Sequence, residues 1–163
     1  MFEERQSSVT GPCYRDVRMV AFDVDGTLVE NEEGLVVWQV FNRLFIGDSD
    51  VNTARLKDHL EGRLSYADWV RIDMEGWQEG NATRAQMKEA IEGQLRLVPH
   101  AREVVHELVR RGYKLAVVSG TLDLVLDVLF PDHPFERVFT NQIRFDESGR
   151  ISGWTATPYD MEG

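Results

Sequence analysis

The sequence predicts an α/β protein with a doubly wound parallel sheet and a helical insertion after the first strand. Three observations support this prediction. Apolar strand patterns alternate with amphipathic helix patterns at both ends of the chain, and a block without strand patterns separates them. The 163 residues, 42% of them hydrophobic, are enough for one core with an insertion. Alternating strands and helices are typical of parallel sheets with right-handed crossovers.

The first strand is expected at residues 17–22, VRMVAF, after a polar tail at 1–16. Its apolar and β-branched residues predict a buried strand. The block at 34–98 is expected to form a helical cap with no strand between its helices. Its four helix patterns cover 35–45, 49–62, 65–77 and 83–98, and the last two open with the N-caps Ser65 and Thr83.

Strand and helix patterns alternate again after the cap. Pro99 and Gly112 bracket a helix, since proline suits the first turn of a helix and glycine its C-terminal end. The later elements are a strand at 113–120, a helix at 121–130, a strand at 137–143 and a hairpin over 143–154. The predicted α/β core is therefore 17–33 together with 99–163.

Composition excludes several classes of partner. The formal net charge is −10 and the isoelectric point is about 4.8, so the surface should repel nucleic acid and anionic membranes. Cys13 is the one cysteine, which excludes an internal disulfide or a cysteine-based metal site and fits the reducing cytosol. Neither a signal peptide nor a membrane span is visible, so we expect a cytoplasmic protein.

The segment DVDGTL directly after the first strand is the clearest chemical signal. Asp23 and Asp25 are two residues apart, so their side chains can face one pocket, and their repulsion requires a proton or a cation. Mg²⁺ suits such a pair, because it favours carboxylate and phosphate oxygens. Gly26 permits a tight turn whose amides can face an anion, and Thr27 adds a hydroxyl. One such aspartate could be only a turn former.

A second signal lies at the end of the second strand. Ser119 and Gly120 offer a hydroxyl and free amides at the start of the next helix, which is a plausible phosphate cradle. Alone, the segment SGT reads more simply as a helix N-cap. Combined with the first loop, it indicates phosphoryl chemistry, in which one aspartate attacks phosphorus and the other transfers the proton.

These two segments resemble known signatures. DVDGTL is similar to the first motif of the haloacid dehalogenase superfamily, VVSGT is similar to its second, and the cap resembles that of the phosphoserine phosphatase branch. The resemblance implies a Rossmann-like core and an Mg²⁺-dependent phosphatase that forms an aspartyl-phosphate. It makes Asp23 the nucleophile and Asp25 the general acid/base, both at the metal. It makes Thr27, Ser119 and Gly120 the phosphate-binding residues.

The substrate is expected to be a small phosphorylated metabolite, with phosphoserine as one candidate. Glu32 stands where that branch has a substrate-binding glutamate, although it could be a solvated loop carboxylate. The branch also has a cap arginine that grips the substrate carboxylate, and Asp73 occupies that position here. Arg71, two residues earlier on the helix, should face elsewhere.

The superfamily's third and fourth motifs, a lysine and an acidic pair on a later strand, are missing. The last lysine is Lys114, inside the second strand. We therefore expect an incomplete core that lacks its C-terminal strands, either as a fragment or as a natural truncation. The missing strand would leave 17–22 as an open apolar edge through which the chain could self-associate. The alternative function is a catalytically inactive binding or regulatory protein.

Overall fold

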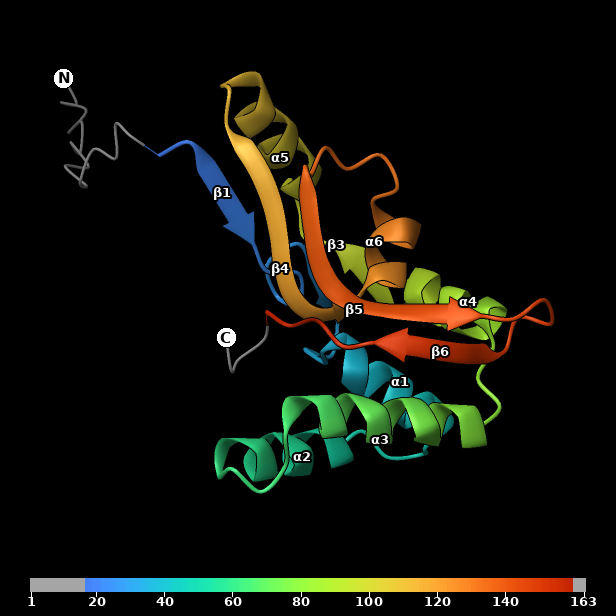
Figure 1. Ribbon diagram of the computed structural model, residues 1–163. Helices are drawn as coiled ribbons and strands as arrows, with labels where there is room; N and C mark the ends of the chain where they lie inside the picture. Colours follow the sequence, from blue (N-terminus) through green and yellow to red (C-terminus); the bar gives the residue numbers. More distant parts are fainter. Residues whose placement is uncertain (1–16, 160–163) are drawn as a thin grey trace, which may run out of the picture.

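The computed structural model describes residues 17–159 as a sheet with helices behind it and a helical layer below it (Figure 1). The predicted tail at 1–16, including Cys13, lies outside the described residues. No helix in the described range is long and apolar enough to cross a membrane.

Three strands of the main sheet are parallel, as predicted. β1 (Met19–Phe22), β4 (Lys114–Leu122) and β5 (Arg137–Phe145) follow one another in that order, and β6 (Ile151–Thr155) closes the sheet antiparallel to β5. β1, β4 and the first half of β5 run toward the helical layer, so the carboxyl ends of β1 and β4 face it (Figure 1). This edge of a parallel sheet is where α/β proteins place their ligands.

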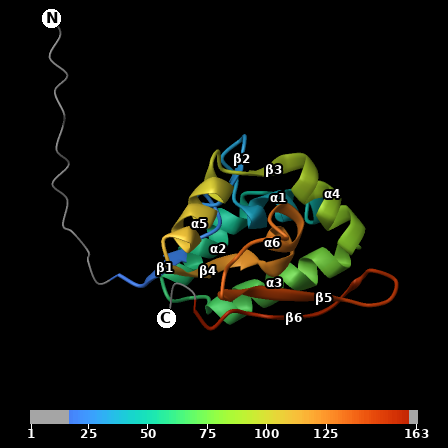
Figure 2. The same ribbon diagram turned by 90° about the horizontal axis from the view of Figure 1, so that it is seen from above.

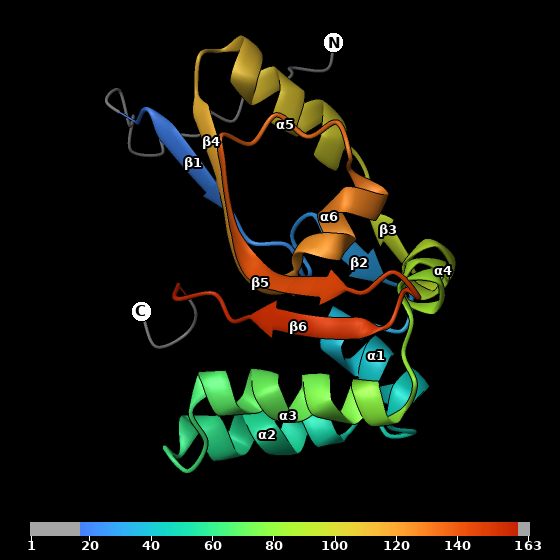
Figure 3. The same cartoon turned by 45° about the vertical axis from the view of Figure 1, so that its right-hand side comes forward.

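β5 serves two partners along its length. Its first half pairs with β4, and its second half turns to pair with β6 above the helical layer (Figure 1; Figure 3). The turn between β5 and β6 is held by Asp146, whose carboxylate accepts the amides of Ser148 and Arg150 at 2.9 and 3.0 Å. The hairpin predicted over 143–154 is therefore confirmed.

The crossover helices α5 (Ala101–Arg110) and α6 (Asp123–Leu129) cover the same face of the sheet (Figure 2). Right-handed crossovers place both helices on one face, because β1, β4 and β5 follow one another in the same direction across the sheet. Buried side chains of β4 and of the two helices fill the layer between them: Val105, Leu115, Val117, Val125 and Leu126. Within 17–159, no helix covers the other face of this sheet. The described residues therefore contain one of the two helical layers of a doubly wound fold.

The insertion contains four helices, as predicted: α1 (Val37–Phe45), α2 (Val51–Leu60), α3 (Tyr66–Glu79) and α4 (Arg84–Gln94). Ser65 and Thr83 are the N-caps of the last two, each accepting the amide three residues later. Three of the helices form the layer below the sheet, with Phe41, Met74 and Trp77 fully buried among them. α4 instead packs against α6.

Two short strands flank the four helices, and no strand of the described range lies between the helices, as predicted. β2 (Val29–Asn31) and β3 (Leu95–Leu97) form an antiparallel ribbon that joins the two ends of the insertion. The helix expected to reach residue 98 stops at Gln94, whose carbonyl accepts the Asn31 side-chain amide at 2.8 Å. Leu95 is buried and Arg96 exposed, an alternation that suits a strand better than a further helical turn.

β1 and the start of α6 also differ from expectation. β1 is half-exposed rather than buried, with Met19 55% exposed, because β4 is its one partner among the described strands. The predicted apolar edge is thus present in residues 17–159. β4 continues through Ser119 and Gly120 to Leu122, so α6 begins at Asp123, two residues later than expected.

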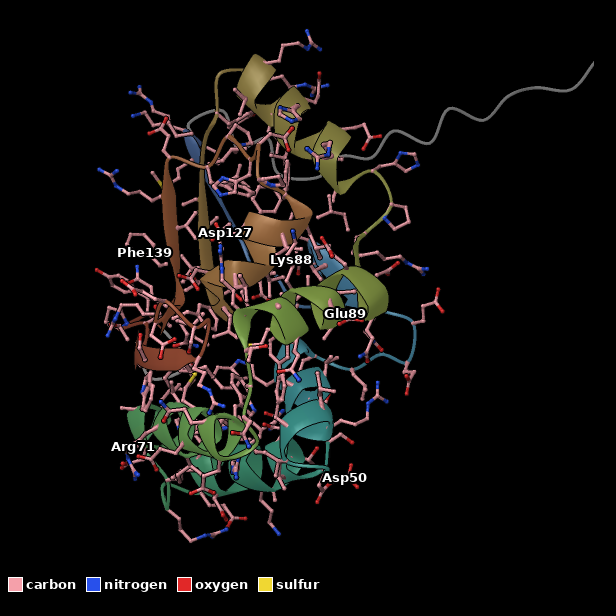
Figure 4. The ribbon with its side chains drawn as sticks, turned by 90° about the vertical axis from the view of Figure 1, so that its right-hand side faces the viewer. Asp50, Arg71, Lys88, Glu89, Asp127 and Phe139 are labelled. Carbon is pink, nitrogen blue, oxygen red and sulfur yellow. The ribbon has the colours of Figure 1, made fainter. Side chains whose placement is uncertain are left out.

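The helical layer contains one buried ion pair. Asp73 on α3 is fully buried and pairs with the Arg55 guanidinium of α2, which is itself mostly buried. Arg71, in contrast, lies on the outer surface of α3, where it binds Asp68 and Glu75 (Figure 4). The expectation that Arg71 faces away from Asp73 is confirmed, and Asp73 is a structural residue with its own counter-charge.

Removing that counter-charge should destabilise the helical layer. We expect Arg55→Met to lower the free energy of unfolding by about 3 kcal/mol, because it leaves the Asp73 carboxylate buried and unpaired. The matched change Arg71→Met removes a guanidinium from an exposed pair and should cost less than about 1 kcal/mol. Urea unfolding of the two variants tests the difference, and equal losses would contradict the assignment.

Candidate active site

The loop after β1 is a tight turn built around the buried Val24. The Val24 carbonyl accepts the amides of Thr27, Leu28 and Val29 at 3.1, 2.9 and 2.9 Å. Gly26 has a φ of 76°, in the left-handed region that glycine adopts without strain, and its amide donates to the Val29 carbonyl at 2.7 Å. The expectation that the amides after Gly26 face an anion is therefore wrong, since the turn itself uses them.

Asp25 connects this turn to the helical insertion. Its Oδ1 accepts the amide of Val37, the first residue of α1, at 2.9 Å. Burial raises the pKa of Asp25 from 3.8 to about 6, and the neighbouring Asp23 charge adds to the rise against the Val37 hydrogen bond and the Thr121 hydroxyl. The carboxyl group therefore changes protonation near neutral pH, as a group that both donates and accepts protons must.

Ser119 and Gly120 lie inside β4, where the strand's pairing with β5 shifts register. The Ser119 hydroxyl accepts the Thr121 amide at 3.2 Å, so its own proton is left for another acceptor. The simpler interpretation of this segment as a helix N-cap is excluded, because the N-cap of α6 is Leu122 and makes no side-chain cap.

Three side chains converge on the carbonyl of Gly120. Trp38 Nε1 of α1 donates to it at 2.8 Å, Asn141 Nδ2 of β5 at 2.6 Å and the Tyr66 hydroxyl of α3 at 3.4 Å. Asn141 Nδ2 also donates to the Tyr66 hydroxyl at 2.8 Å. The junction fixes the end of β4 against both the neighbouring strand and the helical layer.

A cavity of about 400 Å³ lies between the carboxyl edge of the sheet and the helical layer. Its sheet side is formed by Asp23, Asp25, Val118, Ser119, Gly120 and Tyr159. Its helical side is formed by Val36, Trp38, Asn52, Leu56, Tyr66, Trp69 and Val70. The volume falls within the range of small-molecule sites.

Four of the six predicted site residues meet in this cavity: Asp23, Asp25, Ser119 and Gly120. The other two do not line it, which corrects their predicted placement. Thr27 is exposed, and its amide binds the Val24 carbonyl within the turn. Glu32 is exposed beyond β2, where it binds Arg96 of β3 at 2.7 Å, in keeping with the alternative of a surface carboxylate.

Sequence reasoning missed Asn141 and Tyr66. Asn141 is fully buried, and its Oδ1 accepts the Thr157 amide at 2.9 Å. The available signal was its position near the carboxyl end of the third parallel strand, which meets the same sheet edge as the other two strand ends. Tyr66 comes from the helical insertion, so no local pattern relates it to Gly120. Of the cap tryptophans, Trp38 and Trp69 line the cavity, whereas Trp77 packs in the helical layer.

The residues present can hold a magnesium ion with few protein ligands. Asp23 and Asp25 supply hard oxygen atoms, and the amides that close the turn bind the Val24 carbonyl rather than that of Asp25. Mg²⁺ is commonly bound by one or two carboxylates, with water and substrate phosphate as its other ligands. Across residues 17–159 there is no group of three or more metal-ligating side chains, so a larger protein cage is not formed here.

The approach of Tyr66 explains why residue 120 is glycine. A Cβ at this position would lie 2.9 Å from the Tyr66 hydroxyl oxygen. We expect Gly120→Ala to lower the free energy of unfolding by about 1–3 kcal/mol through overpacking. In a Tyr66→Phe background the same change should cost less, because the clashing atom is gone. Urea unfolding of all four combinations tests this, and an equal cost in both backgrounds would refute it.

The pKa of Asp25 makes stability depend on pH. Because its folded value of about 6 exceeds 3.8, Asp25 favours the folded state most below about pH 4, and this contribution is lost as the pH rises through about 6. The difference corresponds to about 3 kcal/mol. Asp25→Asn should lack this dependence, so wild type should lose about 2 kcal/mol relative to it between pH 4 and 7.5, since part of the full difference lies below pH 4. Unfolding experiments with EDTA present measure this, and parallel pH profiles would contradict it.

Comparisons with known proteins agree with this geometry. Residues 17–152 match the family model of the haloacid dehalogenase-like hydrolases. A phosphoserine phosphatase of Archaeoglobus fulgidus is 28% identical over 141 residues, which are 85% of this chain and 38% of that protein. Phosphoserine phosphatase SerB2 of Mycobacterium tuberculosis is 28% identical over 150 residues, which are 88% of this chain and 34% of that protein.

Solved structures share the fold. A phosphoserine phosphatase with a phospho-aspartyl intermediate analogue has a TM-score of 0.66 at 23% identity, covering 86% of this chain and 63% of its own. A HAD family hydrolase from Salmonella enterica serovar Typhi has a TM-score of 0.67 at 20% identity, covering 84% and 44%. The chain spans less than two fifths of the two curated relatives, at 38% and 34% of their lengths. By the family model, the chain belongs to the haloacid dehalogenase-like hydrolases.

Proposed function

We propose that this chain carries the nucleophile and acid/base half of an Mg²⁺-dependent phosphomonoester hydrolase. The observation that supports it most is the meeting of Asp23, Asp25, Ser119 and Gly120 in one cavity at the carboxyl edge of a parallel sheet. The family and the two phosphoserine phosphatases of similar sequence favour the same reaction class.

In the proposed first step, an Asp23 carboxylate oxygen attacks the phosphorus of the substrate. The bond between phosphorus and the ester oxygen breaks, and an aspartyl-phosphate forms on Asp23. Asp23 is the first residue after β1 and is exposed, so a phosphoryl group can reach it from the cavity.

Asp25 transfers a proton in both halves of the reaction. In its protonated form it donates the proton to the leaving ester oxygen. In its ionised form it takes a proton from the water that attacks the aspartyl-phosphate, which releases phosphate and restores Asp23. A pKa of about 6 leaves both forms of Asp25 accessible near neutral pH, and the Val37 hydrogen bond fixes the orientation of its carboxyl group.

Ser119 binds the phosphoryl group through its hydroxyl proton, since the hydroxyl oxygen already accepts the Thr121 amide. Gly120 keeps this segment in place through the three donors on its carbonyl. The role in phosphate binding that the sequence suggested for Thr27 has no support from its position.

The Asp23 carboxylate and the Asp25 backbone carbonyl would hold Mg²⁺, which would supply positive charge that offsets the negative charge of the phosphoryl group. The substrate is a small phosphorylated metabolite that fits the cavity. The names of the two curated relatives make phosphoserine one candidate. A cytoplasmic location is part of this proposal and rests on the sequence alone.

One observation favours a second candidate, a phosphate-binding protein without turnover. No lysine or arginine is among the described residues that line the cavity, and Lys114 lies at the opposite end of β4, near Glu136. The half-exposed β1 edge favours the hydrolase instead, because it suits pairing with a further strand, from a second copy or from another part of the protein. Such a strand could supply the missing cation.

Substitution of the nucleophile tests the proposed mechanism. We expect Asp23→Asn to lower Mg²⁺-dependent phosphate release from p-nitrophenyl phosphate by at least about 10³-fold, because the reaction loses its attacking group. The matched control Glu32→Gln removes a carboxylate outside the cavity and should change the rate by less than about twofold.

The same assay separates the two candidate functions. An unchanged rate in Asp23→Asn would show that the mechanism is wrong. If wild type binds inorganic phosphate but releases none from the ester, the binding protein is the better description.

A further inference from the structure

The helical side of the cavity is almost entirely apolar. Val36, Leu56 and Val70 contribute aliphatic surface, and Trp38 and Trp69 contribute aromatic rings. The Trp38 ring contacts Trp77 with a centroid distance of 4.9 Å, and Trp69 contacts Tyr66 at 6.2 Å. The wall that would face the leaving group of a phosphate ester is therefore hydrophobic and held in place by further aromatic rings.

No described residue of this wall carries a positive charge. The two arginines nearest in sequence are already paired: Arg55 binds the buried Asp73, and Arg71 binds Asp68 and Glu75 on the outer surface. The sheet side of the cavity adds two carboxyl groups, Asp23 and Asp25. A substrate carboxylate would thus lose its hydration, gain no counter-charge here and face like charge.

Two residues of the wall carry buried polar atoms. Asn52 Oδ1 and Trp69 Nε1 have no hydrogen-bond partner among the described residues, and each side chain belongs to a residue only 9% exposed. Both atoms are closed to solvent, so neither adds a polar contact at the surface of the cavity. The wall that a leaving group would touch therefore remains apolar.

We propose that the cavity selects phosphomonoesters whose leaving group is uncharged and largely aromatic or apolar. It disfavours leaving groups that carry a carboxylate, including that of phosphoserine. This inference rests on the proposed function for the phosphate end of the substrate. It adds which chemical groups the leaving group, at the other end of the substrate, can carry.

Binding of non-hydrolysable phosphonates tests the selectivity without relying on turnover. The probes are methylphosphonate, phenylphosphonate and the phosphonate analogue of phosphoserine, titrated into the 163-residue chain by calorimetry with Mg²⁺ present. We expect phenylphosphonate to bind at least about tenfold more tightly than methylphosphonate, because its ring is buried against the tryptophans. The phosphoserine analogue should bind no more tightly than methylphosphonate.

Two arginine substitutions on α2 form a matched pair. The first should reverse the order of the phosphonate affinities, and the second should preserve it. Leu56→Arg places a cation in the cavity wall and should strengthen the phosphoserine analogue about tenfold while weakening phenylphosphonate. Leu60→Arg makes the same change one helical turn away, at a residue 71% exposed and outside the cavity, and should alter neither affinity.

The wild-type titrations decide the inference even if Leu56→Arg does not fold. Binding of the phosphoserine analogue as tight as that of phenylphosphonate overturns the selectivity and leaves the proposed function standing. Binding of none of the three phosphonates overturns the proposed function, and the selectivity with it.

Discussion

The hydrogen bonds on the Gly120 carbonyl are the constraint on which the rest of the site depends. Trp38 and Asn141 approach this one oxygen from the helical insertion and from β5, at 2.8 and 2.6 Å. They hold the end of β4 against the helical layer, in addition to its pairing with β5. Ser119 is its neighbour in sequence, so the placement of the phosphate-binding hydroxyl depends on the same junction.

Asp25 makes the second connection between the sheet and the helical layer. This connection costs stability when Asp25 is charged, whereas the hydrogen bonds on Gly120 add stability. The Val37 amide favours the ionised carboxylate, whereas burial and the charge of Asp23 favour the protonated form by a larger margin. Burial beneath the helical insertion therefore costs stability when Asp25 is charged. It also keeps the pKa where a proton can be both given and taken, which is a common compromise at catalytic sites.

The sequence was sufficient for the parts of the site that are local. Asp23 and Asp25 follow β1 within three residues, Ser119 lies near the carboxyl end of β4, and parallel strands bring such ends to one edge. The placement predicted for Thr27 was wrong because the spacing of a motif does not show which amides and side chains of a turn point toward the site. Asn141 and Tyr66 were missed because their importance arises from contacts between segments far apart in the chain. β3 was missed because three residues after a long helix carry too little periodicity to identify a strand.

The β2–β3 ribbon makes the chain leave the sheet and return to it at one place. Since paired strands lie about 5 Å apart, any segment whose ends meet at that spacing could replace the intervening helices without moving the strands that carry Asp23 and Ser119. α4 limits this freedom, because it also packs against α6 and its Arg84 amide binds the Gly149 carbonyl at 2.8 Å. The first three helices are thus the exchangeable unit. Together with the Val36 linker, they supply the helical wall of the cavity. An exchange of these helices would change the choice of leaving group, but the new segment would again have to place donors on the Gly120 carbonyl and the Asp25 carboxylate, as Trp38 and the Val37 amide do here.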